Sequence, residues 1–357
     1  MTELARSSGF DKYTVVELGR SLPAALCGSH LGAMGMAVGA WRDGGQPGAT
    51  TPADLGWDWS KTVTDGTPAD ADVAAADVVL ADDAPPAGTK PDAVVVTFHA
   101  DYGEPAAAGP ELVLQARSGL VGYVGRQQAM PIRIGAPVVS FATAVAGAQA
   151  VLAALVRRER TGRGAQVSIS GLAVAIALAG NNVTSESDPD AITGFAAQPN
   201  LPPRFGFRCA DGTVDFIFNK DNGGFAAFCE WLSVPELADD PRFASYGTRL
   251  DNEGGLARLL EPRLSRHPAA EVLERLEANG ALCALRYPVA ELVGHPQVSH
   301  LGLLADLDGR TVAQVPFTLD DRRPAAVRVT HMTELARSSD NTVRPVRAVP
   351  SASEVRS

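Results

Sequence analysis

Short apolar runs alternate with helical patterns over the first 180 residues. Runs rich in β-branched residues predict strands at 13–18, 37–41, 78–80, 93–98 and 167–169. Apolar patterns of helical length fall among them, at 23–35, 111–118, 141–158 and 172–180. This alternation predicts βαβ units, and hence an α/β fold with a Rossmann-like, mainly parallel sheet.

The pattern changes after about residue 203. A strand is expected at 213–218, followed by amphipathic helices at 224–232, 254–264 and 269–279. This order of one strand followed by amphipathic helices predicts a smaller α+β domain after the large one. We expect these parts: a large domain at 1–203 completed by 305–330, a small domain at 204–304, and a polar, disordered tail at 331–357.

Composition narrows the function classes. The 357 residues are 45% hydrophobic and 20% charged, which is ordinary for a globular protein. The formal net charge of -10 disfavours nucleic acid or an anionic membrane as a partner, because phosphates would be repelled. Four scattered cysteines without a CxxC pair predict buried free thiols and no metal site. With no apolar signal segment at its start, the sequence predicts a cytoplasmic location.

Residues 134–170 carry the most informative pattern. An apolar strand end leads into an Ala-rich helix, a basic turn closes the helix, and another strand follows. Ser140 stands just before that helix, where its side chain would cap the first backbone N–H groups. Its alternative role is that of a nucleophile served by a distant base. Glu111 opens the preceding helix, where it either complements the helix dipole or acts as a base.

Several short motifs occur in an order that resembles one family. They are VELGRSLP at 16–23, LVLQARSGL at 112–120, RERTGRG at 158–164, DPRF at 240–243 and HPQV at 295–298. Together they resemble the class III CoA-transferases, which include formyl-CoA transferase, carnitine CoA-transferase and α-methylacyl-CoA racemase. The resemblance implies an interlocked homodimer that takes acyl-CoA thioesters as substrate and holds no tightly bound cofactor.

The resemblance also implies a catalytic Asp, whose carboxylate attacks the thioester and forms an acyl anhydride. Ser140 occupies that position, and a neutral hydroxyl cannot form the anhydride. The His of the racemase branch is also missing, because Pro110 precedes Glu111 where that branch has a His and an Asp. We therefore expect Ser140 and Glu111 to line the reacting centre. Arg20, Gln115 and Arg42 are expected to bind the acyl-CoA, although Arg42 is equally explained as an exposed surface residue.

Three hypotheses follow. In the first, the protein is an enzyme with redirected chemistry, such as acyl transfer, proton transfer or elimination with Glu111 as base. In the second, it is a non-catalytic subunit that associates with an Asp-bearing homologue in a hetero-oligomer. In the third, it is an ordinary acyl-CoA:carboxylate CoA-transferase in which Glu111 accepts the acyl group. The sequence does not predict the acyl substrate.

Overall fold

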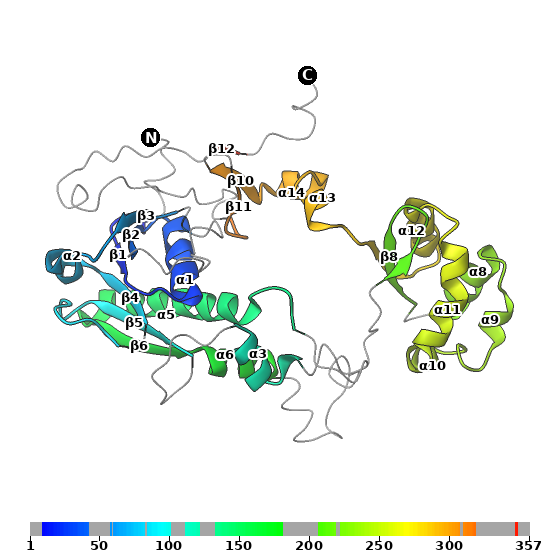
Figure 1. Ribbon diagram of the computed structural model, residues 1–357, viewed down its shortest axis with the longest axis horizontal. Coiled ribbons are helices and arrows are strands. Elements are labelled where there is room, and N and C mark those ends of the chain that lie inside the picture. Colours follow the sequence, from blue (N-terminus) through cyan, green and yellow to red (C-terminus); the bar gives the residue numbers. More distant parts are fainter. Residues whose placement is uncertain are drawn as a thin grey trace. The chain divides into compact units, whose positions relative to one another are not determined.

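Figure 1 shows the computed structural model, which describes residues 9–42, 58, 60–82, 84–100, 111–121, 133–180, 206–218, 222–307, 310–318 and 347–348. The chain divides into two compact units, Met1–Thr184 with Gly294–Ser357 and Ser185–Val293. Each unit has its own hydrophobic core. The boundary predicted near residue 203 lies outside the described residues.

The first unit is built on a six-stranded parallel sheet. Its strands are β1 (Thr14–Glu17), β2 (Ala37–Arg42), β3 (Thr62–Asp65), β4 (Val78–Asp82), β5 (Val94–His99) and β6 (Ala165–Ser170). Their order is β3-β2-β1-β4-β5-β6, and every neighbouring pair is parallel. This is the order of a doubly wound sheet, with its topological switch point between β1 and β4. The prediction of a Rossmann-like α/β fold is confirmed.

Helices cover both faces of this sheet. Those of the first unit are α1 (Leu22–Ala33), α2 (Asp70–Ala75), α3 (Glu111–Arg117), α5 (Val138–Thr161), α6 (Gly171–Leu178) and α14 (Pro296–Leu301). Because strand side chains alternate, Val15 joins the core beneath α1 and α5, while Val16 joins the core beneath α2. α1 and α5 also pack directly against one another. One face of the sheet thus supports α5, whose amino end belongs to the site described below.

Helix α1 has a groove that admits a neighbouring segment. A Cβ at Gly28 would lie on Oε2 of Glu17, and a Cβ at Gly32 would clash with the backbone oxygen of Ser60. Two glycines one helical turn apart therefore let Ser60 and Lys61 lie against the helix. In that position the ammonium group of Lys61 is fully buried.

Helix α5 is apolar and long enough to cross a membrane by length and composition. Half of its most apolar window is buried inside the protein, where residues such as Ala144, Val151 and Leu155 join the sheet core. The helix ends at Gly162, whose left-handed backbone (φ 67°) closes the last turn. Its composition is therefore explained by burial against the sheet.

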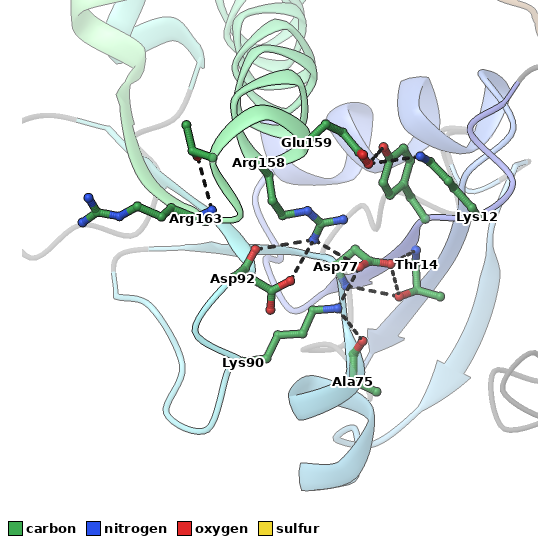
Figure 2. A network of polar contacts seen from close by, with 11 residues as sticks. Lys12, Thr14, Ala75, Asp77, Lys90, Asp92, Arg158, Glu159 and Arg163 are labelled. Carbon is green, nitrogen blue, oxygen red and sulfur yellow. Dashed lines mark hydrogen bonds and ion pairs between the residues drawn. The ribbon is translucent and has the colours of Figure 1, made fainter.

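A polar network ties the end of α5 to the amino ends of the strands (Figure 2). Asp77 accepts from the backbone N of Thr14 (2.9 Å), from Nζ of Lys90 (2.7 Å) and from Nη1 of Arg158 (3.1 Å). Burial alone would raise the pKa of Asp77, but hydrogen bonds from Lys90 and Thr14 and the charges of Lys90 and Arg158 outweigh it. The pKa of Asp77 is therefore lowered.

The basic motif at 158–164 thus has a structural role. Beside Arg158, Glu159 accepts from the hydroxyl of Tyr13 (2.8 Å) and from Nζ of Lys12 (3.0 Å). At 1.5 Å per residue, Arg158 lies roughly 27 Å along the helix from Ser140. These two parts of the family resemblance therefore act at opposite ends of α5.

A small antiparallel sheet completes the first unit. It contains β10 (Leu304–Leu307) between β11 (Arg310–Ala313) and β12 (Arg347–Ala348). Ala305 and Val312 pack with Ala33 at the end of α1. β11 and most of β10 fall within the segment 305–330 that was predicted to complete the large domain. β12 falls within the predicted disordered tail, and the other residues of that tail lie outside the described part of the chain.

The second unit combines a small antiparallel sheet with helices, as predicted. Strand β8 (Thr213–Ile217) pairs with β7 (Phe207–Arg208) and β9 (Leu282–Leu285). Its helices are α8 (Asn222–Trp231), α9 (Glu236–Asp239), α10 (Tyr246–Asp251), α11 (Glu253–Leu264), α12 (Ala269–Ala278) and α13 (Val289–Leu292). Phe216, Phe218, Phe225 and Phe228 meet in its core at ring-centroid separations of 5.4–5.9 Å.

Candidate active site

The carboxylate of Glu111 lies at the amino end of α5. Its Oε1 accepts from the backbone N of Val139 (2.9 Å), and its Oε2 accepts from the backbone N of Ser140 (2.9 Å). The hydroxyl of Ser140 donates a further hydrogen bond to Oε2 at 2.7 Å. A carboxylate is favourable here because the first N–H groups of a helix are unpaired and carry partial positive charge. The first residue of α3 thus caps a different helix.

The predicted capping role of Ser140 is wrong. α5 begins at Val138, with Pro137 at the cap position and no side-chain cap from it. Ser140 lies inside the first turn, and its hydroxyl donates to Glu111 instead of accepting from the backbone. The cause is tertiary: once Glu111 supplies the cap from α3, the helix starts before the serine.

Gln115 stands one turn after Glu111 on the buried side of α3. Its Nε2 donates to Oε1 of Glu111 (2.8 Å), and its Oε1 accepts from the backbone N of Ile134 (3.0 Å). The side chain is fully buried. Gln115 was predicted to bind substrate, but the structure places it behind Glu111, where it fixes both the carboxylate and the segment that enters α5.

The three side chains of this cluster differ in their exposure to solvent. Glu111 is partly exposed, whereas Ser140 has an exposed fraction of only 5% and Gln115 has none. Glu111 is therefore the most accessible residue of the three. Val139 and Thr143 complete the buried wall of this first turn.

A second acidic side chain occupies the switch point of the sheet. Oδ2 of Asp82 accepts from the backbone N atoms of Arg20 (2.6 Å) and Ser21 (2.9 Å), and Oδ1 accepts from the Ser21 hydroxyl (2.6 Å). Sequence reasoning did not assign Asp82 to the site. The available signal was an acid at the end of a buried strand, at the carboxyl edge of the sheet. A phosphate group cannot take the amino end of α1 while Asp82 holds it.

The two predicted arginines lie on strands β1 and β2 or just after them. Arg20 follows β1 at the carboxyl edge and is exposed, while Arg42 is the last residue of β2 at the same edge. Ligands of doubly wound sheets bind outside this edge. The structure thus brings Ser140, Glu111 and Gln115 together at α5 and leaves the two arginines on the edge of the sheet.

Lys61 does not contribute to that edge. Its Nζ lies 2.9 Å from Oε2 of Glu17 and 2.7 Å from Oδ1 of Asp58, and it donates to the backbone oxygen of Ala25 (2.6 Å). All three charged side chains are buried. Sequence reasoning missed this group, because Glu17 and Lys61 are 44 positions apart. In the described part of the chain, no three His, Cys, Asp or Glu side chains are placed to hold a metal ion.

Comparison with known proteins agrees with the motifs. A family model described as CoA-transferase family III matches residues 90–331, which is more than half of the chain. The chain belongs to CoA-transferase family III. The succinyl-CoA:glutarate CoA-transferase of Mus musculus is 27% identical over 212 residues, which are 58% of this chain and 48% of that protein. The acetyl-CoA:oxalate CoA-transferase of Acetobacter aceti is 29% identical over 231 residues, covering 61% and 58%.

Similarity to a solved structure covers nearly all of this chain. A CAIB/BAIF family protein from Brucella suis superposes with a TM-score of 0.74 at 20% identity, covering 97% of this chain and 98% of that one. This similarity shows a shared fold. The chain spans about half the length of the curated relatives that it matches.

Proposed function

We propose that this family III protein is an acyl-CoA:carboxylate CoA-transferase in which Glu111 is the acyl-accepting carboxylate. The supporting observation is the 2.7 Å hydrogen bond between Ser140 and Glu111. The family resemblance expects an acid at position 140, and Glu111 brings a carboxylate to the same turn of α5 from the neighbouring helix. On this proposal the acid has moved from one helix to another and the reaction type is retained.

A single carboxylate is sufficient for the transfer of CoA between two acids. The Glu111 oxygen attacks the thioester carbonyl, the C–S bond breaks, and CoA leaves as thiolate with an acyl-glutamyl anhydride left behind. The thiolate then attacks the glutamyl carbonyl and releases the first acid, which leaves a glutamyl-CoA thioester. The acceptor carboxylate attacks that thioester, which breaks its C–S bond, expels CoA thiolate and forms a second anhydride between Glu111 and the acceptor. CoA returns to the acceptor's acyl carbon, and Glu111 is regenerated.

Ser140 is a weaker candidate for the nucleophile. It is almost fully buried, and its proton is directed at Glu111. Acylation of its hydroxyl would give an ester, which is less activated than an anhydride toward a returning thiolate. A carboxylate avoids this difficulty, because the anhydride and the glutamyl thioester are both activated acyl compounds.

For CoA we propose binding along the carboxyl edge of the sheet, with Arg20 as a phosphate partner. Arg20 is exposed there, whereas Lys61 is held by Glu17 and Asp58 and Asp82 fills the amino end of α1. A guanidinium pairs well with phosphate through parallel hydrogen bonds. The position of Arg42 at the end of β2 is consistent with the same role.

Hydroxylamine trapping of the activated Glu111 carboxyl tests the proposal. The full chain is incubated with an acyl-CoA and hydroxylamine, and its peptides are mapped by mass spectrometry. A hydroxamate on Glu111 is expected, and Glu111→Gln should abolish both the adduct and CoA exchange. The exposed Glu230→Gln serves as a matched control and should retain both. Glutarate and oxalate, which occur in the names of the relatives, are the first acceptor acids to assay.

A different outcome would favour redirected chemistry. The Ser140 hydroxyl donates to Glu111, so the carboxylate is also placed as a general base. Acyl-CoA turnover that depends on Glu111, without any glutamyl hydroxamate, would replace the transferase proposal with acyl transfer, proton transfer or elimination.

The absence of both turnover and adduct would favour a non-catalytic subunit. We propose a homodimer as the working assembly, by analogy with the family. Light scattering on the purified chain distinguishes this assembly from a chain that needs an Asp-bearing homologue to associate.

A further inference from the structure

The two oxygens of Glu111 are held by different kinds of donor. Oε1 accepts from the backbone N of Val139 (2.9 Å) and from Nε2 of Gln115 (2.8 Å). Oε2 accepts from the backbone N (2.9 Å) and the hydroxyl (2.7 Å) of Ser140. Each oxygen thus has two donors, so neither has an unoccupied in-plane lone pair with which to attack.

Three of these donors are fixed in place. The backbone N–H groups belong to the first turn of a 24-residue helix. Gln115 is fully buried, and its Oε1 is occupied by the backbone N of Ile134. The hydroxyl of Ser140 depends on one side-chain torsion, and among the described residues its hydrogen bond goes to Glu111 alone. It is the donor that can move without disturbing the helix.

We infer that Ser140 is a mobile hydrogen-bond donor that moves from Oε2 of Glu111 to the substrate's carbonyl oxygen during acyl transfer. This inference rests on the proposed function. When the hydroxyl turns away, a lone pair on Oε2 becomes available. Oε2 bonds to the thioester carbon, and the carbonyl π electrons move onto the substrate oxygen. Ser140 donates to that oxyanion, whose collapse breaks the C–S bond and expels CoA thiolate. No proton is transferred in this step.

Whether loss of the Ser140 hydroxyl lowers or raises kcat distinguishes this role from one in which Ser140 only restrains Glu111. Removing one donor from an oxyanion site lowers kcat by about 10²–10³-fold. If Ser140 merely restrains Glu111, removing its hydrogen bond makes the carboxylate more basic and the attack faster. The same substitution therefore slows the reaction on one account and accelerates it on the other.

The experiment compares Ser140→Ala with the native chain in steady-state CoA exchange and in the rate of Glu111 hydroxamate formation. We expect kcat to fall about 10²-fold or more while KM for acyl-CoA stays nearly constant, with rescue by Ser140→Thr. The matched control is Thr161→Val at the opposite end of α5, because its hydroxyl donates to the backbone oxygen of Arg157 and not to Glu111. That variant should retain its kcat.

An Ala variant as fast as the native chain, or faster, would overturn the inference and leave the proposed function intact. Absence of the Glu111 adduct in the native chain would instead remove the proposed function, and this inference with it. If Ser140→Ala does not fold, Ser140→Cys keeps a similar shape with a weaker donor. The Cys variant is expected to be slowed, and native-like kinetics would count against the inference.

Discussion

The hydroxyl of Ser140 donates to Oε2 of Glu111 across 2.7 Å, although 29 positions separate the two residues in the chain. This contact restores an acid to the turn where the family resemblance expects one. It also satisfies the amino end of α5, since the same carboxylate accepts two backbone N–H groups. Helix capping and the proposed chemistry therefore use the same side chain.

Placing an acid at position 140 beside Glu111 should destabilise the fold, because the two carboxylates would repel one another. In Ser140→Asp a second carboxylate would lie within hydrogen-bond reach of Glu111, and like charges at that distance raise the pKa of one member. A raised folded-state pKa contributes stability that is lost as pH rises, so the variant should lose more stability relative to the native chain at neutral pH than at about pH 4. Adding Glu111→Gln should relieve the conflict, with a coupling energy of about 1–3 kcal/mol in urea unfolding.

The same double variant makes a prediction about activity. Ser140→Asp with Glu111→Gln has one carboxylate on α5 and an amide in place of the old one. We expect it to recover CoA exchange lost in Glu111→Gln alone, because the acid again stands at the amino end of the helix. Failure of the recovery, in a folded protein, would mean that position 140 cannot present an acid to the thioester.

The lowered pKa of Asp77 predicts a pH-dependent contribution to stability. A depressed carboxyl pKa stabilises the fold above the unfolded value of about 3.9, and this contribution is lost as pH falls through the folded value. Asp77→Asn should lower the free energy of unfolding by about 2 kcal/mol at neutral pH, and much less in acid. Chemical denaturation at several pH values measures the difference, with the exposed Asp251→Asn as control. A constant difference across pH would contradict the ion-pair account.

Lys61 should be essential to the fold of the first unit. Lys61→Met leaves the carboxylates of Glu17 and Asp58 buried without their cation, which typically costs about 3–5 kcal/mol. Adding Glu17→Gln should recover part of the loss, because one of the two stranded charges is removed. Urea midpoints for the single and double variants measure this. A loss below about 1 kcal/mol would show that water reaches the carboxylates.

The thiols should be protected in the native protein. Burial raises the pKa of Cys27 beyond the usual range, that of Cys229 to about 12 and that of Cys209 to about 11. The thiolate is the reactive form, so a thiol reagent at about pH 8 should modify these three cysteines slowly and all four quickly after unfolding. Mass spectrometry of the labelled peptides gives the order. Labelling of Cys27 before unfolding would contradict its burial.

Much of the fold could be predicted from local patterns of apolar and polar residues. Runs such as 93–98 are apolar and β-branched because a parallel strand is covered on both faces, and β5 forms there. β3 was missed because Thr62–Asp65 is short, partly exposed and polar, so it lacks this pattern. It forms by pairing with β2, which a local window cannot detect.

Only part of the candidate site could be predicted from the sequence. The sequence singled out Ser140, Glu111 and Gln115, since the motifs point to them. It assigned Ser140 the wrong contact, because a cap drawn from another helix leaves no trace in the residues next to the helix. The network around Asp77 and the buried Lys61 were likewise invisible, as each joins segments far apart in the chain.

The sequence by itself determined the kinds of element, their order and the family, since hydrophobic periodicity and short motifs are properties of neighbouring residues. Only the tertiary structure decided which acid stands at the amino end of α5. That choice depends on α3 packing against α5, which brings the Glu111 carboxylate to the unpaired N–H groups of the first turn. A buried helix end must find a hydrogen-bond partner, and folding supplied it from a different helix.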